Sequence, residues 1–406
     1  MNPDLERLQT YPFAKLNRLL TGVTPNPSYT PIALSIGEPK QPTPQVIQEA
    51  LLTHLHTLAH YPNTRGLPQL RESIATWLSE RFQLTSAPDP QHQVLPVAGT
   101  REALFAFAQA IIDRNHQPVV VMPNPFYQIY EGAALLAGAQ PYFLNLSQTS
   151  GYLPDFATVP EAIWQRCQLI YVCSPGNPAG AVLTESHWQM LLELADRFDF
   201  VIAADECYSE IYPDEQQPPL GLLQVCQRLG RDDFHRCVVF HSLSKRSNAP
   251  GLRSGFVAGD AKLLEAFFNY RTYHGCALPL PTQHASIAAW QDESHAKANR
   301  TAYRQRFAAV LAELDPVIAI DQPEAAFYLW LKTPGCDRTF ARELYRHYHL
   351  TVLPGSFLSR RTEAGDPGQN HVRIALVPEL SECVNAARRL RDFIHQNSQG
   401  TLNAHD

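Results

Sequence analysis

The chain has 406 residues, 45% of them hydrophobic, with 33 Lys and Arg against 39 Asp and Glu, so its net charge is −6. This length allows two domains with a sizeable core, since domains usually contain about 100 to 200 residues. The mild acidity and the lack of a basic run argue against a nucleic-acid partner, and no stretch reaches the ~18 apolar residues of a membrane span.

The cysteines and histidines do not form a recognisable metal motif. Eight cysteines are spread without a Cys-x-x-Cys pair, and several fall in apolar runs, which is typical of buried free thiols in a reducing cytoplasm. His56 and His60 have the spacing of two ligands on one helix face, but no third ligand accompanies them. The start of the chain lacks the pattern of a secretory signal. We therefore expect a cytoplasmic protein with no metal and no membrane segment.

The first elements in chain order are an arm and a strand. Residues 1–30 predict an N-terminal arm, and Ile32–Ile36 predicts a strand ending at Gly37. From about residue 45, short apolar runs then alternate with helical patterns, at 93–97, 119–122, 168–173, 200–204, 237–240 and 255–257. Strands alternating with helices indicate an α/β fold with a mainly parallel sheet, and continuous apolar runs indicate strands covered on both faces.

The C-terminal third predicts a different arrangement. Residues 283–314 are free of proline and rich in Ala, Arg and Glu, which predicts a long helix leading out of the large domain. Strands are expected at 326–331 and 372–376. We therefore divide the chain into an arm at 1–30, a large domain at 45–290, and a smaller α+β domain made of 31–44 and 291–406.

The most informative segment follows the strand Val238–His241. Lys245 would lie on the turn after this strand, where α/β enzymes place their chemistry, and burial there would lower its pKa and leave an amine able to form a Schiff base. Ser242, Ser244 and Arg253 offer the hydroxyls and the guanidinium that a phosphate group requires. Taken alone, the same composition also suits a solvated loop.

Two further strand ends carry polar groups. Gly99, Thr100 and Arg101 form a small-residue turn that opens a helix, and unpaired N–H groups at such an end bind anions. The alternative is a plain threonine cap. Asn177 lies in a rigid Ser-Pro-Gly-Asn-Pro turn, where its amide can donate to a ligand or simply complete an Asx turn.

A third strand end supplies a carboxylate and a phenol. Asp205 follows Val201–Ala204, and Tyr208 stands three residues on. A carboxylate here would keep a pyridine nitrogen protonated, although a helix cap or a metal ligand would also place an acid at this point. Tyr127 closes another strand and offers a ring to stack on a cofactor, while an aromatic at such a place also suits the core.

In chain order these segments are Gly-Thr-Arg, an aromatic, Asn-Pro-x-Gly, Asp-x-x-Tyr, Ser-x-Ser-Lys and Arg, and the set resembles the fold-type I aminotransferases of class I/II over nearly the whole chain. The resemblance implies a mainly parallel seven-stranded sheet in the large domain and pyridoxal 5′-phosphate as cofactor. Lys245 would be the Schiff-base lysine and proton shuttle. The resemblance also implies which residues contact the cofactor. Its ring would contact Asp205, Asn177, Tyr208 and Tyr127, and its phosphate would contact Gly99, Thr100, Arg101, Ser242, Ser244 and Arg253.

The same resemblance implies substrate contacts and a second subunit. Tyr61 resembles the tyrosine that reaches the phosphate bound by the neighbouring subunit, which implies a homodimer with shared active sites. Arg373, Asn177 and Gly37 would bind the α-carboxylate of amino-acid and 2-oxo-acid substrates. For Arg373 the alternative is a surface ion pair.

Several segments, among them Tyr11–Phe13 and Leu353–Ser356, resemble the succinyldiaminopimelate aminotransferases of lysine biosynthesis. Lys40 departs from the acid usual at its position, so it is expected either to bind a distal carboxylate or to lie solvated. Other amino-acid aminotransferases, such as aspartate or aromatic ones, and β-lyases on the same fold are the enzymatic alternatives. A transcription regulator would need a DNA-binding module, for which the residues before Gly37 leave no room.

Overall fold

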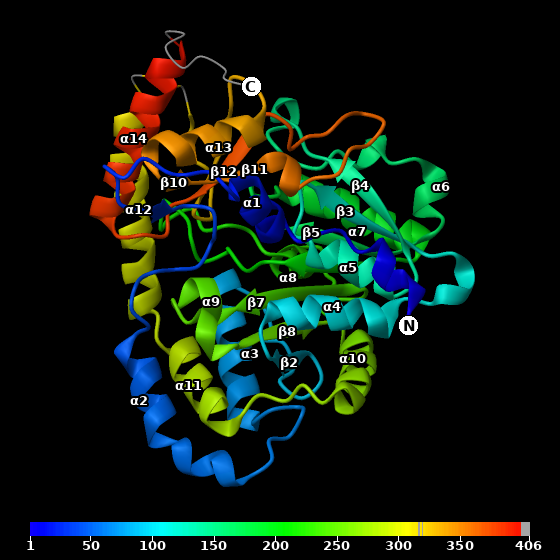
Figure 1. The fold of residues 1–406 in the computed structure, drawn as a ribbon. Coiled ribbons are helices and arrows are strands. Elements are labelled where there is room, and N and C mark those ends of the chain that lie inside the picture. The colour runs from blue at the N-terminus through cyan, green and yellow to red at the C-terminus, as the bar shows by residue number, and fades with distance from the viewer. Residues whose placement is uncertain (316, 319, 399–406) are drawn as a thin grey trace.

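The computed structural model describes residues 1–315, 317–318 and 320–398. A seven-stranded sheet forms its centre (Figure 1). The order across the sheet is β2 (Val94–Val97), β8 (Gly255–Gly259), β7 (Cys237–Ser242), β6 (Val201–Asp205), β5 (Cys167–Cys173), β3 (Val119–Asn124) and β4 (Gln140–Asn145). Strands β4, β3, β5, β6 and β7 pair in parallel, and β8 runs antiparallel to both β7 and β2. The predicted α/β fold with a mainly parallel sheet is confirmed.

Both faces of this sheet are buried, as the continuous apolar runs predict. Alternate residues of β5 pack on opposite sides, Ile170 and Val172 in one core cluster and Leu169 and Tyr171 in the other. The first face is covered by α2 (Gln45–Thr53), α3 (Pro68–Phe82), α6 (Glu161–Trp164), α7 (Glu185–Phe198), α8 (Leu222–Arg228) and α11 (Leu280–Gln291). The second face is covered by α4 (Thr100–Ile111), α5 (Ile129–Leu136) and α10 (Ala261–His274).

A second, smaller sheet has its own core. It is antiparallel, in the order β11 (Leu353–Pro354), β12 (His371–Ala375) and β9 (Tyr328–Lys332). Beside it β1 (Ile32–Ala33) pairs in parallel with β10 (Leu350–Thr351). Its helices are α12 (Ser294–Leu314), α13 (Asp337–Tyr348) and α14 (Leu380–Ser398), which lie together at the upper left of Figure 1. We propose the domain boundaries at 45 and 290 on this basis. Residues 399–406 of the proposed small domain lie outside the described residues.

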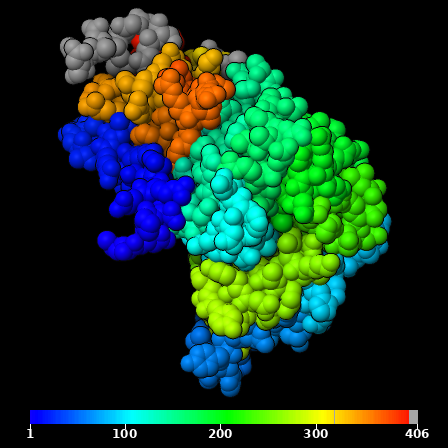
Figure 2. All heavy atoms as spheres, turned by 90° about the vertical axis from the view of Figure 1, so that its right-hand side faces the viewer, coloured from blue at the N-terminus to red at the C-terminus, as the bar shows by residue number. Residues whose placement is uncertain are grey.

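The N-terminal segment lies across the smaller sheet. Helix α1 (Pro12–Leu20) packs Leu16 against Leu353 and Leu358. Figure 2 shows this dark-blue segment against the orange C-terminal part, with a notch between it and the yellow-green helices. The short elements are α9 (Leu243–Arg246) and the 3₁₀ turns η1 (Pro3–Arg7), η2 (Leu55–Ala59), η3 (Arg114–His116), η4 (Gln148–Ser150), η5 (Phe156–Thr158), η6 (Pro250–Leu252) and η7 (Gly355–Phe357).

Two predicted elements differ from the structure. The single helix expected at 283–314 is two helices, α11 and α12, because Asp292 is extended and its carboxylate accepts from the backbone N–H of His295 (3.1 Å), which starts a new helix. The strand expected at 32–36 is only two residues long, and β4 was not predicted. This last strand lies at the sheet edge and is mostly half-buried, so its sequence lacks a continuous apolar run.

Candidate active site

A cavity of about 580 Å³ opens where β5, β6 and β7 end, between the two sheets. It collects side chains from strand ends, from the start of α4 and from the smaller sheet. The residues predicted for cofactor and substrate that line it are Gly37, Thr100, Arg101, Tyr127, Asn177, Asp205, Tyr208, Ser242, Ser244, Lys245, Arg253 and Arg373. Segments as far apart as residues 37 and 373 thus meet at one place.

Lys245 lies in the single turn of α9, directly after β7. Its Nζ donates to the carbonyl oxygen of Gly37, and Nζ also lies 5.5 Å from the centre of the Phe327 ring. Burial lowers the pKa of Lys245 to about 8. About a tenth of this amine is therefore uncharged at pH 7, far more than of an ordinary lysine, and only the uncharged form is a nucleophile.

Asp205 ends β6 and is only 5% exposed. Its Oδ2 accepts from the hydroxyl of Tyr130 (2.6 Å), and its Oδ1 accepts from the backbone N–H of Cys207 (3.3 Å). Burial raises the pKa of Asp205, while these hydrogen bonds act against that rise. Among the described residues no cation forms an ion pair with this carboxylate. A protonated ring nitrogen arriving from the cavity would therefore meet an unneutralised buried acid.

A phosphate cradle lies at the start of α4. Gly99 has φ +85°, and a Cβ at this position would lie 2.4 Å from Nη2 of Arg253, so the guanidinium rests directly on the glycine. The hydroxyl of Ser242 donates to that of Ser244 (2.9 Å), and Thr100 is the first helical residue. Hydroxyls, a guanidinium and a helix N-terminus together form a donor set that suits a phosphate dianion.

The opposite wall carries a second anion site. Arg373 donates through Nη1 to Oδ1 of Asn177 (2.9 Å) and through Nη2 to the carbonyl oxygen of Ser35 (2.9 Å), while its buried Nε has no partner among the described residues. Gly37 stands beside it, where a Cβ would lie 2.0 Å from the hydroxyl oxygen of Tyr328. Only glycine fits here, and the free donor indicates that a carboxylate belongs in this position.

Comparison with known proteins agrees with this arrangement. The model of the family "Aminotransferase class I and II" matches residues 29–390. The chain belongs to this family. The aminotransferase is 48% identical to a solved aminotransferase of Neisseria meningitidis, with a TM-score of 0.93 over 97% of this chain and 99% of the other.

Two further relatives of the aminotransferase have more specific names. It is 30% identical over 396 residues to the LL-diaminopimelate aminotransferase of Nitratidesulfovibrio vulgaris, over 96% of this chain and 98% of the relative. A probable N-succinyldiaminopimelate aminotransferase of Thermus thermophilus is 25% identical, with a TM-score of 0.82 over 94% of this chain and 99% of the other. The family uses pyridoxal 5′-phosphate, which is therefore the cofactor of this aminotransferase. The buried acid, the amine of lowered pKa and the phosphate cradle fit that cofactor.

Three predicted site residues are not part of the cavity lining: Gly99, which Arg253 covers, Lys40 and Tyr61. Lys40 lines a separate hollow together with Tyr345 and Glu382, is 56% exposed, and pairs with Glu38 at 3.5 Å. Tyr61 is fully exposed on another face of the aminotransferase. The structure therefore places Lys40 outside the cavity lining but next to Glu38, which belongs to it, whereas the prediction for Tyr61 concerns a neighbouring subunit.

The resemblance places Arg101 around the phosphate, which stays a prediction. In the structure its guanidinium donates to the hydroxyl oxygens of Tyr127 (2.8 Å) and Tyr11 (3.4 Å) at the mouth of the cavity. A side chain from the N-terminal segment thus completes this part of the wall. The side chain of Arg101 is available to a ligand beyond the phosphate.

Sequence reasoning missed three supporting residues of the aminotransferase. Tyr328 shares a hydrogen bond with Tyr208 (3.0 Å between the hydroxyl oxygens), and Tyr130 binds Asp205 as described. Asn299 of α12 donates from Nδ2 to the carbonyl oxygens of Lys245 (3.0 Å) and Arg246 (3.2 Å). Each lies on an element far along the chain from its partner, so no local motif could reveal it.

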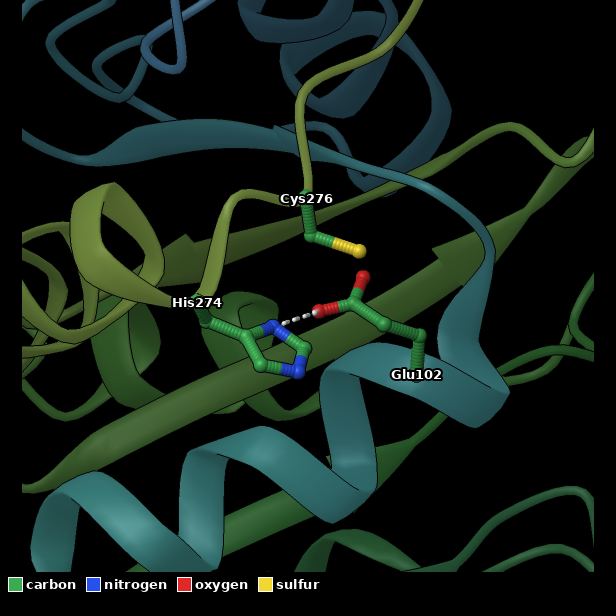
Figure 3. A group of neighbouring side chains, drawn as sticks. All are labelled: Glu102, His274 and Cys276. Carbon is green, nitrogen blue, oxygen red and sulfur yellow. Dashed lines mark ion pairs between the residues drawn. The ribbon is translucent and has the colours of Figure 1, made fainter.

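A group of potential metal ligands lies near the phosphate cradle. Glu102, His274 and Cys276 converge in Figure 3, and Nδ1 of His274 lies 3.9 Å from Glu102. The fully buried Arg271 already donates to the same carboxylate, and burial raises the pKa of the Cys276 thiol. A guanidinium on the carboxylate and a protonated thiol are unfavourable for a cation. We interpret the group as an ion-pair network that fixes α10 against α4.

No helix in the described part of the chain combines the length and the apolar character that crossing a bilayer demands.

Proposed function

We propose that this aminotransferase acts on amino acids of the diaminopimelate class, which carry a second carboxylate far from the first, with glutamate and 2-oxoglutarate as the other substrate pair. The observation that carries the proposal is Arg101, a guanidinium of the cavity wall outside the phosphate cradle that donates to two tyrosine hydroxyls and forms no ion pair with a carboxylate among the described residues. Arg373 is suited to the α-carboxylate, because it offers a buried unpartnered donor, and Arg101 is suited to the distal carboxylate. Both guanidinium groups line the same cavity.

The two named forms of this substrate differ in their distal end. The sequence resemblance favours the N-succinyl form, in which an amide and a further carboxylate replace the distal ammonium group. The relatives named for the free LL form, and the carboxylate of Glu38 at the cavity wall, favour an ammonium group there. We keep both forms as candidates, since Arg101 would serve the distal carboxylate of either.

The side chains of the chain have separate tasks in this proposal. The bound cofactor supplies an electron sink for the substrate Cα. Lys245 would hold the cofactor's aldehyde carbon and, once displaced by substrate, move a proton at Cα. Asp205 would keep the ring nitrogen protonated, and Asn177 and Tyr208 would donate to the phenolic oxygen. Tyr127 would lie on the ring face.

The test uses the absorbance of the purified yellow holoenzyme. Each candidate amino acid is added alone, without a 2-oxo acid, and the visible band of the bound cofactor is followed. We expect either the free or the succinylated diaminopimelate to remove the band and 2-oxoglutarate to restore it. A band that responds to glutamate or aspartate but to neither diaminopimelate would contradict the substrate class. Release of ammonia and a 2-oxo acid from a β-substituted amino acid would indicate a β-lyase instead.

We also propose that the active unit is a homodimer in which Tyr61 completes the partner's site. Tyr61 is fully exposed, and Leu52, Leu55 and Leu58, which shortly precede it in the chain, are each more than 40% exposed. Leu58 and Tyr61 line a hollow with Leu280. Exposed apolar side chains of this kind favour burial against a second copy.

Subunit mixing tests this arrangement. Lys245→Ala and Tyr61→Ala variants are each purified, mixed, and allowed to exchange subunits. A hybrid dimer holds one site with both residues intact, so about a quarter of the wild-type rate should return if Tyr61 crosses the interface. Sedimentation measures the dimer independently. No recovery in a mixture shown to contain hybrids would mean that Tyr61 does not serve the partner's site.

A further inference from the structure

Two stacked tyrosines have no solvent-exposed surface, and one of them, Tyr130, belongs to the cavity lining. Tyr130 is on α5 and Tyr171 is on β5, their ring centres are 4.7 Å apart at an angle of 11°, and both are fully buried. In each case the hydroxyl makes a hydrogen bond with an oxygen–oxygen distance of 2.6 Å. As packing elements the two side chains are nearly equivalent.

Their hydroxyl partners differ. Tyr171 donates to the backbone carbonyl oxygen of Leu104, inside α4, whereas Tyr130 donates to Oδ2 of Asp205. Burial raises the pKa of the Tyr130 phenol well above its ordinary value, so this group stays a donor throughout the physiological range. A carboxylate with one oxygen held by Tyr130 and the other by the Cys207 N–H is fixed in rotation, and its charged form is stabilised.

We propose that Tyr130 is a positioning residue that acts through Asp205 on the ring nitrogen of pyridoxal phosphate. The inference rests on the proposed role of Asp205. Tyr130 is also placed edge-on to Tyr127, with ring centres 5.8 Å apart at 86°, so the start of α5 orients both the acid at the ring edge and the aromatic predicted to lie on the ring face. Without the hydroxyl, only the Cys207 N–H would hold the carboxylate, which would be less firmly fixed and would more readily take up a proton.

The experiment compares Tyr130→Phe with Tyr171→Phe, which removes an equally buried hydroxyl from the same stack. Equilibrium binding to the cofactor-free proteins is measured with pyridoxal phosphate and with an analogue in which carbon replaces the ring nitrogen. Losing a hydrogen bond to a charged group should weaken pyridoxal phosphate binding about tenfold or more in Tyr130→Phe. The analogue should bind Tyr130→Phe and the wild type equally, and Tyr171→Phe should bind both ligands as the wild type does.

Other outcomes overturn the inference in recognisable ways. Equal losses in both variants would reduce Tyr130 to a packing residue. If Tyr130→Phe lost the same affinity for both ligands, for example through misfolding, Tyr130 would not act on the ring nitrogen. If its affinity for both ligands were unchanged, Tyr130 would have no effect on cofactor binding. If the wild-type chain failed to bind pyridoxal phosphate, the proposed function itself would be wrong, so the two failures are distinguishable.

Discussion

The floor of the cavity and its mouth are built in different ways. The floor takes Asp205, Ser242 and Lys245 from the ends of adjacent parallel strands, where a few consecutive residues fix each position. What we call the mouth is the wall opposite the phosphate cradle together with the entrance, and it takes Arg373 and Ser35, which are 338 residues apart, and Tyr11 from the N-terminal segment. The floor depends on local sequence, whereas the mouth depends on how the two sheets assemble. We therefore expect the floor to carry the chemistry and the mouth to bind the substrate.

Replacing the lysine of the floor should have the largest effect. Lys245→Arg keeps the positive charge but offers neither a neutral amine nor an exchangeable proton near neutral pH, so transamination should fall by at least about a thousandfold for every amino acid. Initial rates with glutamate and with diaminopimelate measure this. Lys297→Arg, on the exposed face of α12, is the control. Residual activity of a few per cent would contradict the role of Lys245.

Replacing the arginine of the mouth should affect binding rather than chemistry. Arg373→Lys keeps one charge but loses the fork that spans Asn177 and Ser35. We expect kcat/KM to fall about 10- to 100-fold for all amino acids, mainly through KM, with the affinity for pyridoxal phosphate unchanged. An equal fall in cofactor affinity would show that the floor and the mouth are not separate in the way described.

The distal carboxylate offers a finer test of the mouth. Arg101→Gln should raise KM about tenfold for diaminopimelate and for glutamate, and much less for alanine, which lacks a second carboxylate. Lys40→Ala tests the alternative, because this lysine lines another hollow but pairs at 3.5 Å with Glu38, which lines the cavity. If Lys40→Ala raised KM only for substrates with a second carboxylate and Arg101→Gln did not, Lys40 rather than Arg101 would bind the distal carboxylate.

The lowered pKa of Lys245 predicts a pH dependence of cofactor capture. Only the neutral amine attacks the aldehyde, so the rate should rise as the pH increases through the pKa of about 8. Between pH 7 and 9 we expect an increase of about tenfold, followed by a plateau. Stopped-flow absorbance measures it, and N-acetyl-lysine methyl amide under the same conditions corrects for changes in the aldehyde. A rate that kept rising above pH 10 would indicate an exposed amine with the usual pKa of 10.5.

The same contrast explains what the sequence could predict. The strands of the large sheet and the motifs at their ends were identifiable, because buried parallel strands carry continuous apolar runs and the turns after them hold their functional residues within a few positions. Strand β4 escaped because an edge strand lacks that pattern, and the end of α11 escaped because one capping aspartate decides it.

Pairings between distant segments could not be predicted in this way. The Tyr130 and Tyr328 hydroxyls reach their partners across 75 and 120 residues, and the direction of the Arg101 side chain depends on Tyr11. Lys40 illustrates the same limit. The sequence could not show where its side chain lies, and in the structure it lines a separate hollow while its ion-pair partner Glu38 lines the cavity.

Helix α12 contacts both the turn that carries Lys245 and the core of the smaller sheet. Near its start Asn299 holds the carbonyl oxygens of Lys245 and Arg246, and farther along Phe307, Val310 and Leu314 pack into the core of the smaller sheet. A rotation of that sheet toward a substrate held by Arg373 must either break both hydrogen bonds of Asn299 or carry the turn of Lys245 with it. The turn that carries the reactive amine is therefore tied, through one helix, to the core of the smaller sheet.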